Sequence, residues 1–123
     1  MASVIIVDDS PVNRKLLRNI LETEGFEVIG EAVNGKEGYE EFQKTAPDVV
    51  TLDVSMPQMN GIEALMLMKE HNPEVKVIIL SAEGQKEMRD EAEKYGADGF
   101  VTKPYQKSEI LSAIKSCTED RKS

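Results

Sequence analysis

The chain has 123 residues and a formal net charge of −8, from 15 basic and 23 acidic side chains. This length suits one domain, expected to span residues 1–123, and the acidic balance argues against a nucleic-acid or membrane-surface protein. One cysteine, Cys117, excludes an internal disulfide, and the absence of a signal peptide or of an apolar run near the roughly 18 residues of a membrane span predicts a cytoplasmic protein.

Five short apolar runs alternate with five longer segments of helical character. The first run, residues 3–7, is followed by a helix from Ser10-Pro11 to Glu24, with Leu16, Leu17, Ile20 and Leu21 as its core-facing positions. We then expect strands at 26–31, 49–52, 75–80 and 98–102, and helices at 36–44, 62–71, 85–95 and 108–118. This alternation predicts an α/β fold: a flavodoxin-like, doubly wound five-stranded parallel sheet in the order 2-1-3-4-5, with five helices.

Polar side chains stand where four of these strands end. They are Asp8 and Asp9 after the first, Asp53 after the third, Ser81 after the fourth and Lys103 after the fifth. Since the carboxyl ends of parallel strands share one edge, and neighbouring strands lie about 4.8 Å apart, the three carboxylates should converge. Mg²⁺ would relieve their repulsion, and the Lys103 side chain is long enough to approach Asp53.

Each of these residues also has an ordinary structural role. Asp8-Asp9 before Ser10-Pro11 suits helix capping, and an aspartate at a strand end is often a solvated turn residue. Their joint placement at one sheet edge favours a functional site. Two other functions fit the sequence less well. A phosphatase of the haloacid-dehalogenase type needs a second aspartate at the position of Ser55. An FMN-binding flavodoxin would not place Asp8 and Asp9 beside the phosphate of the cofactor, because their charges would repel it.

Four motifs in chain order resemble the receiver domain of two-component response regulators. They are Val-Asp-Asp-Ser at 7–10, Leu-Asp-Val-Ser-Met-Pro with Gly61 at 52–61, Leu-Ser-Ala at 80–82 and Val-Thr-Lys-Pro at 101–104. The resemblance covers essentially the whole chain and is strongest to stand-alone receivers of the CheY type that act in chemotaxis.

The resemblance implies a role for each site residue. Asp53 would be the phosphoacceptor, taking a phosphoryl group from a histidine kinase, and Lys103 and Ser81 would contact the phosphoryl oxygens. Asp8, Asp9, Asp53 and the backbone carbonyl of Ser55 would hold Mg²⁺. The Lys103–Pro104 peptide is expected to be cis. Such a chain is a phosphoacceptor signalling protein that catalyses only its own phosphorylation and dephosphorylation, and is not otherwise an enzyme.

The same resemblance implies a switch formed by Ser81 and Phe100. Phosphorylation would draw Ser81 toward Asp53 and turn Phe100 inward, altering the face made by the last two helices and the last strand, where Tyr105 and Lys107 are candidate contact residues. Phe100 stands where the best-known chemotaxis members have tyrosine.

The implied partners are a chemotaxis-type histidine kinase and a downstream protein such as a flagellar switch component, with the chain acting as a monomer. An alternative is a phosphorelay intermediate that passes phosphate to a histidine phosphotransferase. A degenerate receiver that only docks to other proteins is disfavoured because all five site residues are present.

Overall fold

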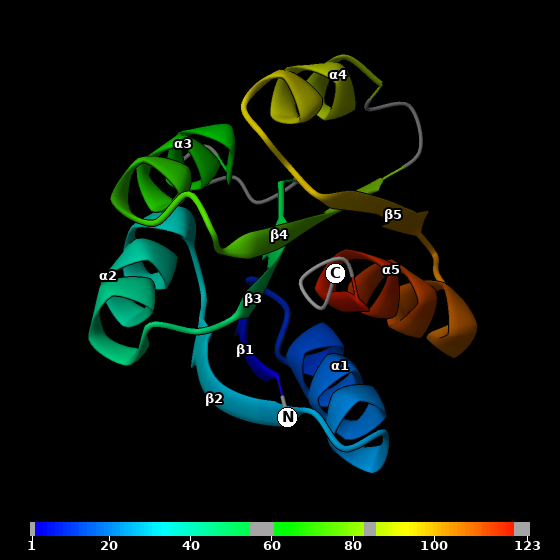
Figure 1. Cartoon of the computed structure of the whole chain (residues 1–123). Helices are drawn as coiled ribbons and strands as arrows, with labels where there is room; N and C mark the ends of the chain where they lie inside the picture. The colour runs from blue at the N-terminus through cyan, green and yellow to red at the C-terminus, as the bar shows by residue number, and fades with distance from the viewer. Residues whose placement is uncertain (1, 55–60, 83–85, 120–123) are drawn as a thin grey trace.

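The computed structural model describes residues 2–54, 61–82 and 86–119. Five parallel strands form one sheet in the order β2-β1-β3-β4-β5, as predicted (Figure 1). The strands are β1 (Ser3–Val7), β2 (Glu27–Ala32), β3 (Val49–Asp53), β4 (Lys76–Ala82) and β5 (Gly99–Lys103). The helices are α1 (Pro11–Thr23), α2 (Gly35–Thr45), α3 (Gly61–His71), α4 (Lys86–Lys94) and α5 (Lys107–Glu119). No described helix has the length and apolar character that a membrane crossing requires.

Helices cover both faces of the sheet, and each face has its own hydrophobic core (Figure 1). Successive side chains of a strand point to opposite faces, so β1 sends Ile5 and Val7 to one core and Val4 and Ile6 to the other. The first core packs against α2, α3 and α4, and the second against α1 and α5. The central strand β3 is buried along its whole length, which explains why it reads in the sequence as a continuous apolar run.

Helix ends follow the capping signals closely. The Ser10 hydroxyl accepts a hydrogen bond from the amide of Asn13, and Asn34 does the same for Glu37 at the start of α2. Gly25, after α1, has a φ of 90°, a conformation that favours glycine. The Ser10 cap starts α1 only three residues after the end of β1.

Several local predictions differ from the structure, mostly by one or two residues at the ends of elements. Leu16 is 45% exposed because the core-facing stripe of α1 is limited to Leu17, Ile20 and Leu21. Ser81 lies inside β4, which extends to Ala82. The last helix begins at Lys107, before Ser108, since the Gln106 amide donates to the Glu109 carboxylate and the Gln106 carbonyl accepts from the next turn.

Candidate functional site

The strand ends bring the predicted site residues to one edge of the sheet. Asp53 is the last residue of β3 and lies opposite Leu80 of β4, one position before Ser81. Asp8 follows β1 directly, and Lys103 ends β5. In the sheet, β1 lies on one side of β3, β4 lies on the other side, and β5 follows β4. The side chains at the ends of these strands therefore converge on Asp53.

Asp53 and Lys103 form a partly buried ion pair. The Lys103 ammonium donates to Oδ2 of Asp53 at 2.8 Å, and the Asp53 side chain is 2% exposed against 21% for Lys103. The same ammonium lies 3.6 Å from Oδ2 of Asp8, whose side chain is fully buried. One lysine therefore faces two carboxylates, and its positive charge offsets only part of their negative charge.

Asp8 is fixed through nearly all of its polar atoms. Its amide donates to the carbonyl of Ala32, and its Oδ1 accepts from the Ser10 amide at 2.8 Å. Its carbonyl accepts from the Arg14 guanidinium at 2.7 Å. Oδ2 is the exception: it is buried with no hydrogen-bond partner, although Lys103 lies nearby.

These surroundings shift two pKa values. Burial raises the pKa of Asp8, and the negative charge of Asp53 raises it further. The hydrogen bond from the Ser10 amide lowers this pKa, but by less, so the pKa of Asp8 is raised. Burial alone would lower the pKa of Lys103, but the hydrogen bond and charge of Asp53 outweigh it, and the pKa is raised. The resting site thus holds more negative charge than the protein neutralises.

The arrangement suits a hard divalent cation. Asp8, Asp9 and Asp53 each bring one carboxylate oxygen within 4.8 Å of the other two. The unpartnered Oδ2 of Asp8 is one of the polar atoms that a cation would satisfy, and an all-oxygen, carboxylate-rich donor set is the type that Mg²⁺ prefers. Ser55, whose carbonyl is a predicted ligand, lies outside the described residues.

Ser81 and Phe100 occupy neighbouring strands on the far side of Asp53. The Ser81 hydroxyl is fully buried and has no hydrogen-bond partner. Phe100 is partly buried against the core under α4, with the Arg89 guanidinium over its ring. A buried hydroxyl without a hydrogen-bond partner lowers the stability of the folded protein, and an acceptor placed beside it would remove that cost.

Tyr105 adds a second unsatisfied hydroxyl close to the site. It follows the Lys103–Pro104 peptide, which is cis as expected. Its buried hydroxyl has no hydrogen-bond partner, and burial, together with the charges of Asp8 and Asp53, raises its pKa to about 12. The phenol is therefore neutral at physiological pH and can act only as an uncharged donor or acceptor.

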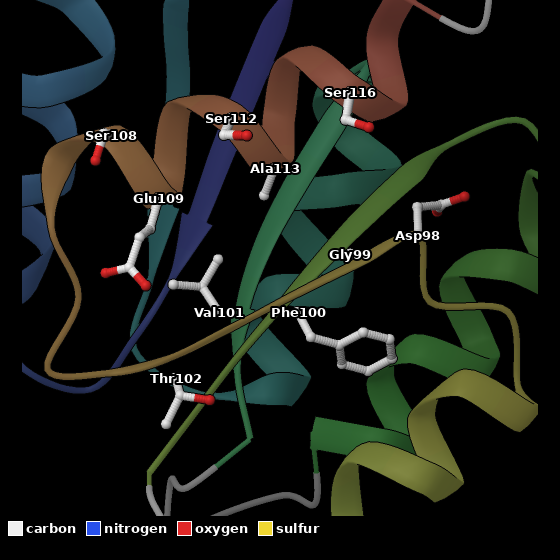
Figure 2. A pocket seen from close by; sticks show the side chains of 10 residues that line it. All are labelled: Asp98, Gly99, Phe100, Val101, Thr102, Ser108, Glu109, Ser112, Ala113 and Ser116. Carbon is white, nitrogen blue, oxygen red and sulfur yellow. The ribbon is translucent and has the colours of Figure 1, made fainter.

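A separate groove of about 720 Å³ runs along the sheet edge formed by β5, beside α5 (Figure 2). Hydroxyl and carboxylate groups from Ser108, Glu109, Ser112 and Ser116 line its helical side, and Val101 and Thr102 line its strand side. It includes none of the three clustered carboxylates. The groove is thus distinct from the place where chemistry is expected.

Comparison with known proteins decides the family. The model of the response regulator receiver domain matches residues 4–115. The chain belongs to the response-regulator receiver family. Receivers are signalling proteins that generally bind Mg²⁺, and the carboxylate cluster of this receiver could hold such an ion.

Several relatives share most of the receiver's length. It is 42% identical over 116 residues to the chemotaxis protein CheY of Thermotoga maritima, covering 94% of this chain and 97% of that one. It is 40% identical over 111 residues to CheY of Bacillus subtilis, covering 90% and 92%. Among solved structures, a CheX–CheY–BeF₃–Mg²⁺ complex from Borrelia burgdorferi matches with a TM-score of 0.90 and 34% identity, over 95% of this chain and 89% of that one.

A receiver domain protein from Clostridium thermocellum superposes still more fully. Its TM-score is 0.92 at 29% identity, covering 99% of this chain and 98% of that one. The predicted fold and strand order are therefore confirmed both by the sheet itself and by this likeness.

Asp8, Asp9, Asp53 and Lys103 lie together, with Ser81 one residue beyond the partner of Asp53 on β4. Sequence reasoning did not single out Arg14 or Arg89, which touch the Asp8 carbonyl and the Phe100 ring. For Arg14 a signal existed: it lies in the first turns of the helix that follows the acidic pair. For Arg89 there was none, since it is one charge among many on a very polar helix.

Proposed function

We propose that Asp53 of this receiver accepts a phosphoryl group from a phosphohistidine and that the resulting charge switches a protein-binding face. The observation that carries the proposal is the buried Asp53 carboxylate, which is held by Lys103 at 2.8 Å and has two more carboxylates beside it. A purely structural aspartate has no need of this acidic surplus, whose repulsion costs stability.

The transfer uses groups that the chain already holds in place. A carboxylate oxygen of Asp53 attacks phosphorus, the bond from phosphorus to the donor imidazole nitrogen breaks, and its electron pair stays on that nitrogen. With the ring protonated on its other nitrogen, the donor leaves as neutral imidazole. Lys103 turns its ammonium from the carboxylate to a phosphoryl oxygen, and the Ser81 hydroxyl donates to another. Mg²⁺, held by Asp8, Asp9, Asp53 and the Ser55 carbonyl, would neutralise carboxylate and phosphoryl oxygens.

Phosphorylation would be communicated through Ser81 and Phe100. The hydroxyl of Ser81 gains the acceptor that it lacks in the resting protein, and its displacement leaves room for the Phe100 ring to turn inward. Phe100 belongs to β5, and its ring packs against the core under α4. The surface that changes is therefore formed by α4, β5 and α5. Tyr105, which precedes α5, and Lys107, with which α5 begins, are candidate contact residues on it.

The role of the switch is chemotaxis signalling. Several relatives about 40% identical over most of the chain are named chemotaxis protein CheY, and a similar solved structure contains CheY with CheX. The phosphodonor is a chemotaxis-type histidine kinase, the output partner is a protein such as a flagellar switch component, and the receiver acts in the cytoplasm as a monomer.

The decisive experiment is transfer of radiolabelled phosphate from an autophosphorylated histidine kinase. Label should pass to the wild-type chain with Mg²⁺ and not with EDTA, and Asp53→Asn should take up none. Asp90→Asn, which removes an exposed carboxylate from α4, is the matched control and should be labelled normally. Labelling of Asp53→Asn, or labelling that needs no Mg²⁺, would contradict the mechanism.

A second measurement separates the two output roles. For chemotaxis, the phosphorylated chain should bind a motility protein more tightly than the unphosphorylated chain. For a phosphorelay intermediate, the label should instead move on to a histidine of an added phosphotransferase.

A further inference from the structure

Arg14 links the acidic site to a strand at the other side of β1. It lies near the start of α1, and its side chain is only 17% exposed. One terminal nitrogen donates to the Asp8 carbonyl at 2.7 Å, while Nε lies 3.1 Å from Oε1 of Glu31 on β2. The guanidinium group is thus held at two points. The planar arrangement of its N–H donors allows this, whereas the single ammonium of a lysine would not.

The atom that Arg14 holds belongs to the peptide group between Asp8 and Asp9. A peptide is planar, so fixing its oxygen fixes the direction in which the chain leaves toward Asp9. The Asp8 amide is already held by Ala32, and its Oδ1 by the Ser10 amide. Asp9 is exposed, yet it places a carboxylate oxygen within 4.8 Å of both other acids. The bond from Arg14 is the contact that orients the peptide leading to it.

We propose that Arg14 is a positioning residue for the Mg²⁺ site. It holds the Asp8–Asp9 peptide so that both carboxylates face Asp53. This inference rests on the proposed function, because it assigns Arg14 a part in binding the cation that phosphoryl transfer requires. Arg14 itself is not a ligand, since a guanidinium has no lone pair to offer.

The two ways in which Arg14 could act on the site, by positioning the carboxylates or through its charge alone, predict opposite changes in Mg²⁺ affinity when Arg14 is replaced. Arg14 carries a positive charge beside the site, so if charge were its only effect, removing it would strengthen Mg²⁺ binding. If Arg14 positions the two carboxylates, removing it weakens binding, because the acids are no longer held in a shared geometry. The direction of the change therefore identifies the role.

Arg18 is a matched control on the next turn of α1. Its Nε lies 2.6 Å from Oε2 of the same Glu31, and its NH1 lies 2.9 Å from Glu22. Arg18→Gln removes an equal charge and an equal tie to Glu31 while leaving the Asp8 carbonyl bond in place. A loss of Mg²⁺ affinity that Arg14→Gln shows and Arg18→Gln lacks points to that bond, because removal of the Arg14 charge alone would act in the opposite direction.

The test is calorimetric titration of the phosphate-free chain with MgCl₂, which suits a protein that has no tryptophan to report binding. Arg14→Gln should raise the Mg²⁺ dissociation constant about tenfold, the size expected when a residue that orients metal ligands is lost. Arg18→Gln should leave the constant unchanged or lower it slightly. In the metal-free protein, the amides of residues 8–10 should exchange hydrogen faster in Arg14→Gln than in Arg18→Gln.

Equal or tighter Mg²⁺ binding by folded Arg14→Gln overturns the inference. If Arg14→Gln does not fold, Arg14→Lys carries the test: it keeps the charge but cannot hold both acceptors, so weaker binding supports the inference and unchanged binding overturns it. Failure of the proposed function is a separate result: the wild-type chain would then bind Mg²⁺ and yet take up no label from the kinase on Asp53.

Discussion

The guanidinium carbon of Arg89 on α4 lies 5.2 Å from the centre of the Phe100 ring on β5. The arrangement is a cation–π contact, and Arg89 also keeps a buried Nε without a hydrogen-bond partner. Because the ring would have to leave this contact to turn inward, Arg89 stabilises the resting position of Phe100.

Replacing Arg89 with alanine should therefore favour the phosphorylated conformation. A cation–π contact near the surface contributes about 0.5–1 kcal/mol, so the affinity for beryllofluoride with Mg²⁺ should rise about two- to fivefold. The measurement is a beryllofluoride titration followed by NMR. In a Phe100→Ala background the Arg89 change should have no further effect, and an equal gain there would show that Arg89 acts without the ring.

Asp8→Asn should stabilise the metal-free protein at neutral pH. Since the pKa of Asp8 is raised on folding from its ordinary value of 3.8, the native state binds more protons than the unfolded state between that pH and the folded pKa. The free energy of unfolding therefore falls over that interval, and the cost is larger at pH 7 than at pH 4. Thermal unfolding in EDTA should show a higher Tm for Asp8→Asn at pH 7.

The same stabilisation should shrink as the pH approaches 4 and when Mg²⁺ is added, because protonation or the cation removes the repulsion in the wild type. Asp90→Asn, on the exposed face of α4, should show no such pattern. A lower Tm for Asp8→Asn at pH 7 in EDTA would mean that the Lys103 contact outweighs burial.

Thr51→Val should also raise stability, by about 1 kcal/mol. The Thr51 hydroxyl is fully buried in the central strand without a hydrogen-bond partner, between Ile6 and Ile78 of the neighbouring strands. Valine has nearly the same shape and removes the unsatisfied group. Thr51→Ser keeps the hydroxyl and removes a methyl group, so urea unfolding should show a loss of about 1 kcal/mol. If both variants lost stability, the hydroxyl would have to be satisfied in solution.

Asp98 should be important for stability and unimportant for phosphorylation. Its Oδ2 accepts from the Lys69 ammonium at 2.8 Å and from the Val77 amide at 2.9 Å, joining α3, β4 and the start of β5. Asp98→Ala leaves both donors without this acceptor and should cost about 2–3 kcal/mol in urea unfolding, and Asp98→Asn about half of that. Since Asp98 precedes β5 and the site follows it, phosphotransfer by the folded variants should match the wild type.

Much of the fold could be predicted because local and long-range signals agree. The apolar run before Asp53 had to be a buried strand, and Ser10-Pro11 with Gly25 marked both ends of α1. The convergence of Asp8, Asp53 and Lys103 followed from strand order alone, because parallel strands end at one edge.

The error at Leu16 and the missed contact of Arg14 both depend on how side chains are placed. Leu16 and Leu17 are identical residues in adjacent positions, and only the packing of α1 decides that the first is exposed. The Arg14 bond to the Asp8 carbonyl depends on a rotamer and on Glu31 reaching across from β2. Periodicity specifies which face of an element is buried, but it carries no information about which of several arginines meets a particular carbonyl.

The ion pair between Asp53 and Lys103 joins residues 50 positions apart in the chain. With Asp8 from β1, the site draws on the first, third and fifth strands of a sheet whose strand order is not the chain order. No contiguous fragment that ends before β5 contains the complete site. The site is therefore complete only when the whole sheet has assembled. Under the proposed mechanism, a chain that is still being synthesised, or one that has lost its last strand, would take up no phosphoryl group.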